Sequence, residues 1–226
     1  MLGGMGPEAT ADFFVKLIRL TPARCDAEHL HVVIDSNPQI PDRTAFIERK
    51  GPSPLPLLVA TARRLVDAGA DLLVMPCITA HLFIDEIRDA VDATVLSALE
   101  VAARHVDGTY DPGDALALLA STGTLRARLF EHAMPGRTFV TPTDVEQADV
   151  VMHAVYGPDG VKTVGADART RERMQAYVAE LAGRGARAVV AGCTEFSVLF
   201  AGVALALPLV DPMMLLAEEA VRTARE

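Results

Sequence analysis

The sequence predicts an α/β protein made of two pseudo-symmetric lobes, each with a parallel sheet, and an active-site cleft between the lobes. Apolar runs of strand length alternate with longer helical patterns, which indicates parallel strands connected by helices. The chain has 226 residues, enough for one large α/β domain or two compact lobes. One strand-and-cysteine pattern occurs twice, which favours two lobes.

Seven apolar runs have the length and composition of buried strands, at 30–35, 72–76, 94–97, 115–120, 137–141, 187–191 and 207–210. Helical periodicity is found over 7–21, 54–68, 79–92, 143–156, 167–183 and 212–225. Only Met1 and Leu2 precede the first glycines. We therefore expect either a very short first strand or further residues upstream.

The repeated pattern covers residues 69–77 and 185–193, which share Gly, Ala, Val and Cys at equivalent places. Each segment ends a helix at a glycine, runs through a strand and delivers a cysteine to the carboxyl edge of that strand. The turns at 3–6 and 121–124 repeat at nearly the same offset. We predict a first lobe from 1–98 plus 208–226, and a second lobe from 99–207.

Ligands of open α/β sheets bind beyond the carboxyl ends of the strands, so the duplication brings Cys77 and Cys193 to one cleft. A thiol at a helix N-terminus is favoured as the thiolate. If one thiolate removes a proton from carbon and a thiol on the opposite face returns one, the centre inverts. The alternative is two small buried residues, a common use of free cysteine; the matched pair favours the functional interpretation. Cys25 lacks this context and is predicted to be structural.

The charge and composition exclude several classes of protein. The formal net charge is −9 and no basic cluster is present, which argues against nucleic-acid and anionic-membrane partners. No apolar run approaches the roughly 20 residues that span a bilayer, and no signal segment is apparent, so we expect a cytoplasmic protein. Its three cysteines should then be reduced.

The opening Gly4-Met5-Gly6-Pro7-Glu8-Ala9 fits the spacing of a dinucleotide-binding turn. Asp26 and Asp35 lie near the expected position of the acidic partner, but no second nucleotide motif accompanies them, so NAD is disfavoured. The three lysines lie outside any pyridoxal-phosphate motif, and the six histidines are dispersed. We expect no cofactor and no metal.

Taken together, the motifs resemble the PLP-independent aspartate/glutamate racemases of the Asp/Glu/hydantoin racemase superfamily. The resemblance spans the chain, with motifs at 3–7, 26–29, 40–44, 76–81, 121–124, 161–162 and 192–195. It implies a two-lobed fold, a homodimer, no cofactor, and Cys77 and Cys193 as the acid and base.

The resemblance also implies the substrate-binding residues. Thr79, Thr122 and Thr124 would lie near the α-carboxylate, while Arg43 and Lys162 would bind the distal carboxylate. The remaining predicted substrate-binding residues are Met5, Gly6, Ile78 and Thr194. His81 and Glu195 follow their cysteines closely and would either tune a thiol or satisfy a helix terminus.

One position departs from the family pattern, because the usual Cys-Asn-Thr is Cys77-Ile78-Thr79 here. An isoleucine supplies no polar contact, and an unsatisfied buried polar group costs about 1–3 kcal/mol. The main prediction is a racemase or epimerase of a small acidic amino acid, aspartate- or glutamate-like. The alternatives are a cysteine-dependent decarboxylase or cis–trans isomerase of a small dicarboxylate, and a non-catalytic carboxylate-binding protein.

Overall fold

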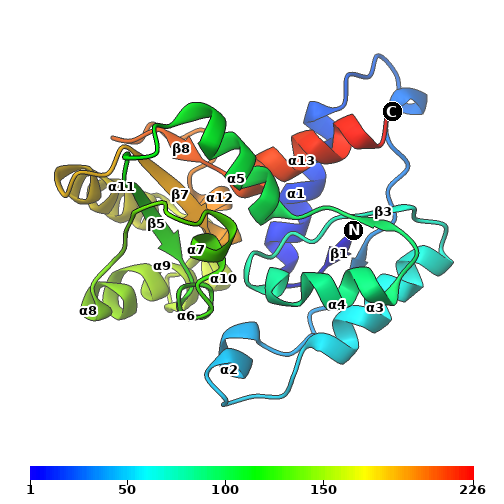
Figure 1. Cartoon of the computed structure of the whole chain (residues 1–226), viewed down its shortest axis with the longest axis horizontal. Coiled ribbons are helices and arrows are strands. Elements are labelled where there is room, and N and C mark those ends of the chain that lie inside the picture. The colour runs from blue at the N-terminus through cyan, green and yellow to red at the C-terminus, as the bar shows by residue number, and fades with distance from the viewer.

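The computed structural model describes residues 1–226 and divides into two α/β lobes (Figure 1). The strands are β1 (Leu2–Gly3), β2 (Asp35–Ser36), β3 (Leu72–Leu73), β4 (Thr94–Val95), β5 (Leu116–Ala120), β6 (Phe139–Val140), β7 (Ala188–Gly192) and β8 (Leu209–Val210). All their pairings are parallel, as the alternation of strands and helices predicts.

The α-helices are α1 (Pro7–Leu20), α2 (Arg43–Ile47), α3 (Leu55–Asp67), α4 (Ile84–Ala90), α5 (Ala98–Thr109), α6 (Thr122–Arg126), α7 (Leu129–Ala133), α8 (Asp144–Glu146), α9 (His153–Tyr156), α10 (Val161–Val164), α11 (Ala168–Gly183), α12 (Thr194–Leu199) and α13 (Pro212–Thr223). The 3-10 turns η1 (Asp26–Glu28) and η2 (Thr79–Phe83) and the π-helical turn η3 (Gln147–Met152) complete the chain. None of the helices combines the length and apolar character needed to cross a membrane.

The first lobe contains β1 to β4. Strand β1 pairs with β2 and β3 pairs with β4, and the Leu2 amide donates to the Val74 carbonyl at 2.9 Å, which places β1 beside the β3 segment. The Gly4 turn follows β1 with φ +94°, and a Cβ there would lie 2.4 Å from the Asn37 backbone. Glycine is therefore required at this turn.

The second lobe contains a four-stranded sheet in the order β6-β5-β7-β8. Strands β5 and β7 are continuous apolar runs, buried at every position, and their side chains alternate between two cores. Leu116 and Leu118 point toward the core shared with the first lobe, whereas Ala117 and Leu119 pack in the core that includes residues of α11 and α12.

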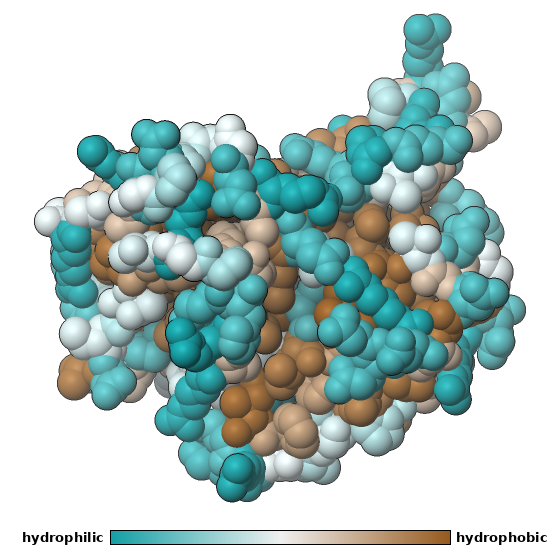
Figure 2. All heavy atoms as spheres, viewed as in Figure 1, coloured by the Kyte–Doolittle hydropathy of each residue, from teal (hydrophilic) through white to brown (hydrophobic).

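The shared core joins the lobes. It contains Phe13 of α1, Ala102 of α5 and Leu216 of α13, together with Val74 and Ile78 from the first lobe. Helix α13 packs against both α1 and α5, and these three helices lie in the centre of the molecule (Figure 1). Apolar side chains also gather where the lobes meet on the face shown in Figure 2, while hydrophilic side chains cover much of the outer surface.

Several local predictions need correction. The predicted strand 30–35 pairs as a strand only at Asp35–Ser36, because residues 30–34 run extended past the start of β1. The predicted helix 79–92 begins as the 3-10 turn η2, and the predicted helix 143–156 contains the π-helical turn η3. Strand β8 extends the second sheet, although the predicted boundary at 208 assigns it to the first lobe. Helix α5 was absent from the predicted helices.

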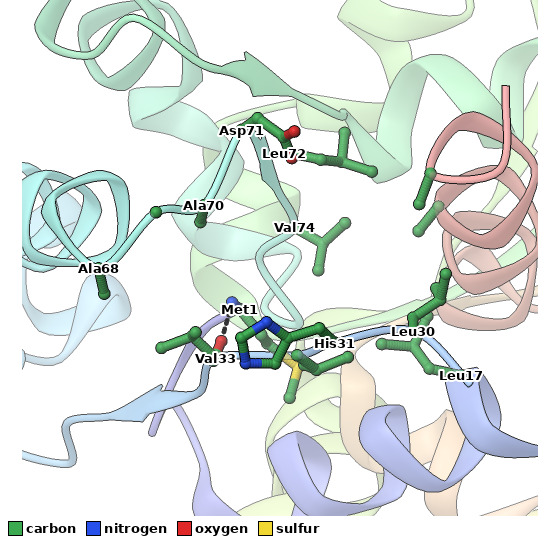
Figure 3. Close-up of a pocket in the computed structure, with 14 residues that line it drawn as sticks. Met1, Leu17, Leu30, His31, Val33, Ala68, Ala70, Asp71, Leu72 and Val74 are labelled. Atoms are coloured by element: carbon green, nitrogen blue, oxygen red, sulfur yellow. Dashed lines mark hydrogen bonds between the residues drawn. The ribbon is translucent and has the colours of Figure 1, made fainter. Parts of the chain in front are cut away.

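A cavity of about 220 Å³ lies at the amino ends of the first-lobe strands, lined by Met1, His31, Val33, Asp71 and Val74 among others (Figure 3). The Met1 ammonium donates to the Val33 carbonyl at 2.6 Å, and burial lowers its pKa to about 6 against the opposing charge of Asp35. This cavity shares no residue with the cysteine pocket described below. It lies at the end of the sheet opposite to where α/β proteins bind ligands.

The shared core predicts that truncating the side chain will destabilise the protein far more at one position of α1 than at another. Phe13 is fully buried in it, whereas Val15 is 39% exposed. Phe13→Ala should lower the free energy of unfolding by about 3–5 kcal/mol through loss of apolar contact and a residual cavity. Val15→Ala, the control, should change it by less than about 1 kcal/mol. Urea titrations measure both; similar losses in the two variants would contradict the assignment of the core.

Candidate active site

Both predicted cysteines line one pocket between the lobes. Cys77 follows β3 in the first lobe, and Cys193 follows β7 directly as the residue before α12. Both are free thiols and buried, with 4% and 7% of their surface exposed. The pocket is lined by Met5, Arg43, Cys77, Ile78, Thr79, Ser121, Tyr156, Lys162, Cys193, Thr194 and Glu195.

The pocket is closed. Its free volume is about 10 Å³, about the minimum that holds one water molecule. Helix α2 of the first lobe packs on α6 of the second, where a Cβ on Gly123 would lie 2.6 Å from Thr44 Oγ1. An amino acid does not fit in this volume, so the pocket must widen before one can bind.

Three buried hydroxyls form a triangle across the lobe boundary. Thr79 Oγ1 lies 3.1 Å from Ser121 Oγ and 2.8 Å from Thr124 Oγ1, and the latter two are 3.1 Å apart. Each hydroxyl carries one proton and two lone pairs, so the group can turn its donors toward a carboxylate. Ser121 also caps α6 by accepting from the Thr124 amide.

Arg43 brings a buried cation to the Cys77 side of the pocket. Its guanidinium donates to the carbonyls of Met5 and Pro41, at 3.1 and 3.2 Å, while its Nε atom has no partner. Burial works to lower the pKa of Arg43, but the neighbouring Cys77 and Asp42 raise it above its ordinary value. The guanidinium therefore stays charged, and its Nε donor is buried and unpaired.

The carboxylate of Glu195 lies beside Cys193. The Cys193 thiol donates to Glu195 Oε2 at 2.8 Å, and Lys162 Nζ lies 2.5 Å from Glu195 Oε1. Burial and then the charge of Glu195 raise the pKa of Cys193 well above its ordinary value. Burial also works to raise the pKa of Glu195, but Lys162 holds it below its ordinary value.

The two thiols therefore have unlike electrostatic surroundings. The Arg43 cation lies beside Cys77, whereas the carboxylate beside Cys193 favours a thiol that keeps its proton. The structure therefore brings two thiols with different charged neighbours to one small pocket.

His81 has a structural position. Its Nδ1 atom lies 2.9 Å from the Cys77 carbonyl oxygen, and Nε2 accepts from the Ala98 amide at the start of α5 at 3.0 Å. Burial lowers its pKa to about 4, against smaller opposing contributions from backbone hydrogen bonds. The neutral ring connects the Cys77 backbone to a helix N-terminus and has no contact with the thiol in the structure. Of the two roles considered for His81, the geometry favours the structural one.

Three other predicted residues lie outside the pocket lining. Gly6 lies beside it, where a Cβ would be 3.3 Å from Lys162 Nζ. Thr122 points elsewhere, since its hydroxyl accepts from Gln147. Thr124 contributes through the hydroxyl triangle. Sequence reasoning omitted Ser121 and Tyr156 from the site residues. Ser121 begins a recognised motif, whereas nothing local to Tyr156 indicates its contact with Lys162, which lies 5.5 Å from the ring centre.

The structure contains no group of three or more His, Cys, Asp or Glu side chains arranged to hold a metal ion. The pocket does contain the charged side chains of Arg43, Lys162 and Glu195. Two thiols and two cations line one small volume, and the hydroxyls of Thr79 and Ser121 line it as well. The fold and the site thus define a class of two-lobed α/β proteins with two cysteines in one pocket between the lobes.

Comparison with known proteins identifies the family. The model of the Asp/Glu/hydantoin racemase family matches residues 2–220, and the chain belongs to this family. The broad specificity amino-acid racemase RacX of Bacillus subtilis is 23% identical over 99% of this chain and 96% of its own length. Glutamate racemase of Corynebacterium kroppenstedtii is 27% identical over 62% of this chain and 47% of its own length.

Solved structures support the fold. The aspartate racemase of Picrophilus torridus aligns with a TM-score of 0.86 at 24% identity, covering 99% of this chain and 92% of that one. The glutamate racemase of Francisella tularensis, solved with D-glutamate, aligns with a TM-score of 0.63 at 15% identity, covering 99% and 78%. The family and the two-lobed α/β fold expected from the cysteine motifs are confirmed, and the chain is an isomerase of the racemase class.

The buried neutral His81 predicts a pH dependence of stability. Its pKa is about 4 in the folded protein against 6.5 in the unfolded chain, so below pH 6.5 the unfolded state binds the proton first. The stabilisation is complete above pH 6.5 and is lost as the pH falls toward 4, up to roughly 3 kcal/mol. Urea titrations from pH 7 to pH 4 should show a steeper loss for the wild type than for His81→Gln. Parallel curves would exclude a buried neutral imidazole.

Proposed function

We propose that this protein is a cofactor-independent racemase of a small acidic amino acid, in which Cys77 and Cys193 act as the two bases. The observation that carries the proposal is that both buried thiols line one closed pocket between the lobes. Membership of the racemase family supports an amino-acid substrate.

In this mechanism the Cys77 thiolate removes the proton from one face of Cα and the Cys193 thiol supplies a proton to the other. The S–H bond of Cys193 breaks as the new C–H bond forms, and the electron pair left on Cα is held by the adjacent carboxylate meanwhile. The reverse reaction uses the same groups in exchanged roles. Because Cα–H is a very weak acid, the closed pocket and its preorganised donors must stabilise the developing charge.

The hydroxyls of Thr79 and Thr124 are the donors we assign to the α-carboxylate. Both are buried and belong to the hydroxyl triangle, whereas the Thr194 hydroxyl donates to Glu195. Donors that are fixed before the reaction need no reorganisation when negative charge develops. Thr79 lines the pocket together with both cysteines, which supports this assignment.

Arg43 is the stronger candidate for the distal carboxylate. Its Nε atom is unpartnered, whereas Lys162 already pairs with Glu195. A substrate carboxylate would have to compete with Glu195 for Lys162, but meets an unused donor on Arg43. We therefore assign Arg43 to the substrate side chain, with Lys162 in a secondary contact.

Ile78 keeps a second substrate class open. It is 2% exposed and supplies an apolar wall beside Cys77. A family relative that matches the chain over almost its full length has broad amino-acid specificity, which supports a test panel wider than the acidic amino acids. A dicarboxylate decarboxylase or cis–trans isomerase would use the same thiols without an α-amino contact.

The central test is exchange of the Cα proton in D2O, followed by proton NMR and chiral chromatography on L- and D-aspartate, glutamate and neutral amino acids. The wild type should exchange the Cα proton and produce the opposite enantiomer. Cys77→Ala and Cys193→Ala should each lower racemisation at least about 100-fold, because each removes one proton-transfer group. Cys25→Ala, a change at an exposed thiol, should leave the rate unchanged.

Either single pocket variant with full activity would contradict the two-base mechanism. Exchange by the wild type without formation of the other enantiomer would indicate one-sided proton transfer. Ligand-induced thermal stabilisation without exchange on any substrate would indicate a binding protein.

A further inference from the structure

The two-base mechanism leaves the enzyme in a changed protonation state. After one turnover by the route above, Cys77 holds the proton taken from the substrate and Cys193 is a thiolate. A second turnover in the same direction requires Cys193 to regain a proton and Cys77 to lose one. In the form that the structure shows, the pocket has space for about one water molecule, so a protein group that reaches from a thiol to a larger cavity provides a route for proton exchange.

Glu195 is the only carboxylate that lines the catalytic pocket. Its Oε2 atom accepts from the Cys193 thiol at 2.8 Å and from the Thr194 hydroxyl at 3.1 Å. Its other oxygen faces Lys162 at 2.5 Å. The Glu195 side chain is 5% exposed and that of Lys162 is 23% exposed, so the pair extends from the thiol toward the surface.

A second cavity lies on the other side of this ion pair. This outer cavity has a volume of about 330 Å³ and is lined by Gly6, Pro7, Glu8, Ala9, Val161, Lys162, Glu195 and Val198. Lys162 and Glu195 are the two residues that it shares with the catalytic pocket. Its size accommodates several water molecules.

We propose that Glu195 relays protons between the Cys193 thiol and water in the outer cavity, and so restores the protonation state of Cys193 between turnovers. In the reprotonation step, water in the outer cavity gives a proton to Glu195, and the O–H bond of Glu195 then breaks as the S–H bond of Cys193 forms. The reverse sequence carries a proton out. This proposal rests on the two-cysteine function proposed above.

The electrostatics of the site fit this role. While Cys193 holds its proton, Glu195 is ionised and paired with Lys162. Once Cys193 becomes a thiolate, two negative charges lie at hydrogen-bond distance, and such a pair binds one proton readily. The other ionisable groups nearby are Arg43, Tyr156 and Cys77 in the catalytic pocket and Glu8 in the outer cavity. Of the two carboxylates, Glu195 and Glu8, only Glu195 contacts a cysteine.

The kinetic test uses Glu195→Gln, which keeps the shape of the side chain and cannot relay a proton as a carboxylate. Rapid-quench assays with a single enantiomer should show a burst of about one product per site, followed by a steady rate at least about tenfold lower than wild type. The wild type should show no burst. Glu195→Asp should restore part of the steady rate. The matched control is Glu8→Gln, at a residue that lines the outer cavity but not the catalytic pocket.

A second measurement is independent of activity. Alkylation by iodoacetamide, followed for each cysteine by mass spectrometry, should be about tenfold faster at Cys193 in Glu195→Gln at pH 8, because removal of the carboxylate favours the thiolate. Cys77 should change less. If the alkylation rate of Cys193 is unchanged in Glu195→Gln, the contact between Glu195 and the thiol is overturned, whether or not the enzyme is active.

The outcomes separate the two proposals. A wild type that does not racemise any substrate would overturn the proposed function and the relay with it. A wild type that racemises, with a Glu195→Gln variant that has a low rate but no burst, would leave the function standing and overturn the relay.

Discussion

The packing of α1, α5 and α13 between the two lobes is the constraint on which the rest of the structure depends. Phe13, Ala102 and Leu216 are fully buried there, and the same core continues to Ile78 at the edge of the pocket. Because interiors are close-packed and resist small shifts, this core fixes the carboxyl edge of one sheet opposite that of the other. The position of each thiol relative to its partner follows from that arrangement.

The presence of two similar lobes was predictable because one short sequence motif occurs twice. A glycine that ends a helix, a buried apolar strand and a cysteine at its carboxyl edge occur twice, and this motif places both thiols without knowledge of the loops. The strand predicted at 30–35 is shorter and displaced in the structure, because it pairs with the short strand β1. The apolar pattern of the sequence does not reveal this tertiary partner. Helix α5 follows Ser97, whose side chain caps the helix by accepting from the Glu100 backbone amide; a serine at this position is a helix-start signal in the sequence.

Within the site, residue types were easier to predict than their partners. Arg43 and Lys162 are both cations in the pocket, but only the structure shows that Lys162 is neutralised by Glu195 while an atom of Arg43 remains unpartnered. Tyr156 comes from the end of α9 and meets Lys162 of α10 through a turn, so its place depends on loop geometry. Which charged side chains pair with one another depends on the tertiary structure. For this reason the motifs alone did not show which of the two cations has a carboxylate partner.

Ile78 shows how the core and the chemistry are coupled. Its side chain belongs to the core that joins the lobes and also lines the pocket beside Cys77. A polar residue at this place would need buried hydrogen-bond partners, whereas isoleucine extends the dry core as far as the thiol. The low-dielectric wall strengthens the interaction of Arg43 with charge on Cys77 or on a bound anion. In the proposed mechanism, an apolar or small substrate group faces this wall, and Arg43 and the hydroxyl triangle supply the polar contacts.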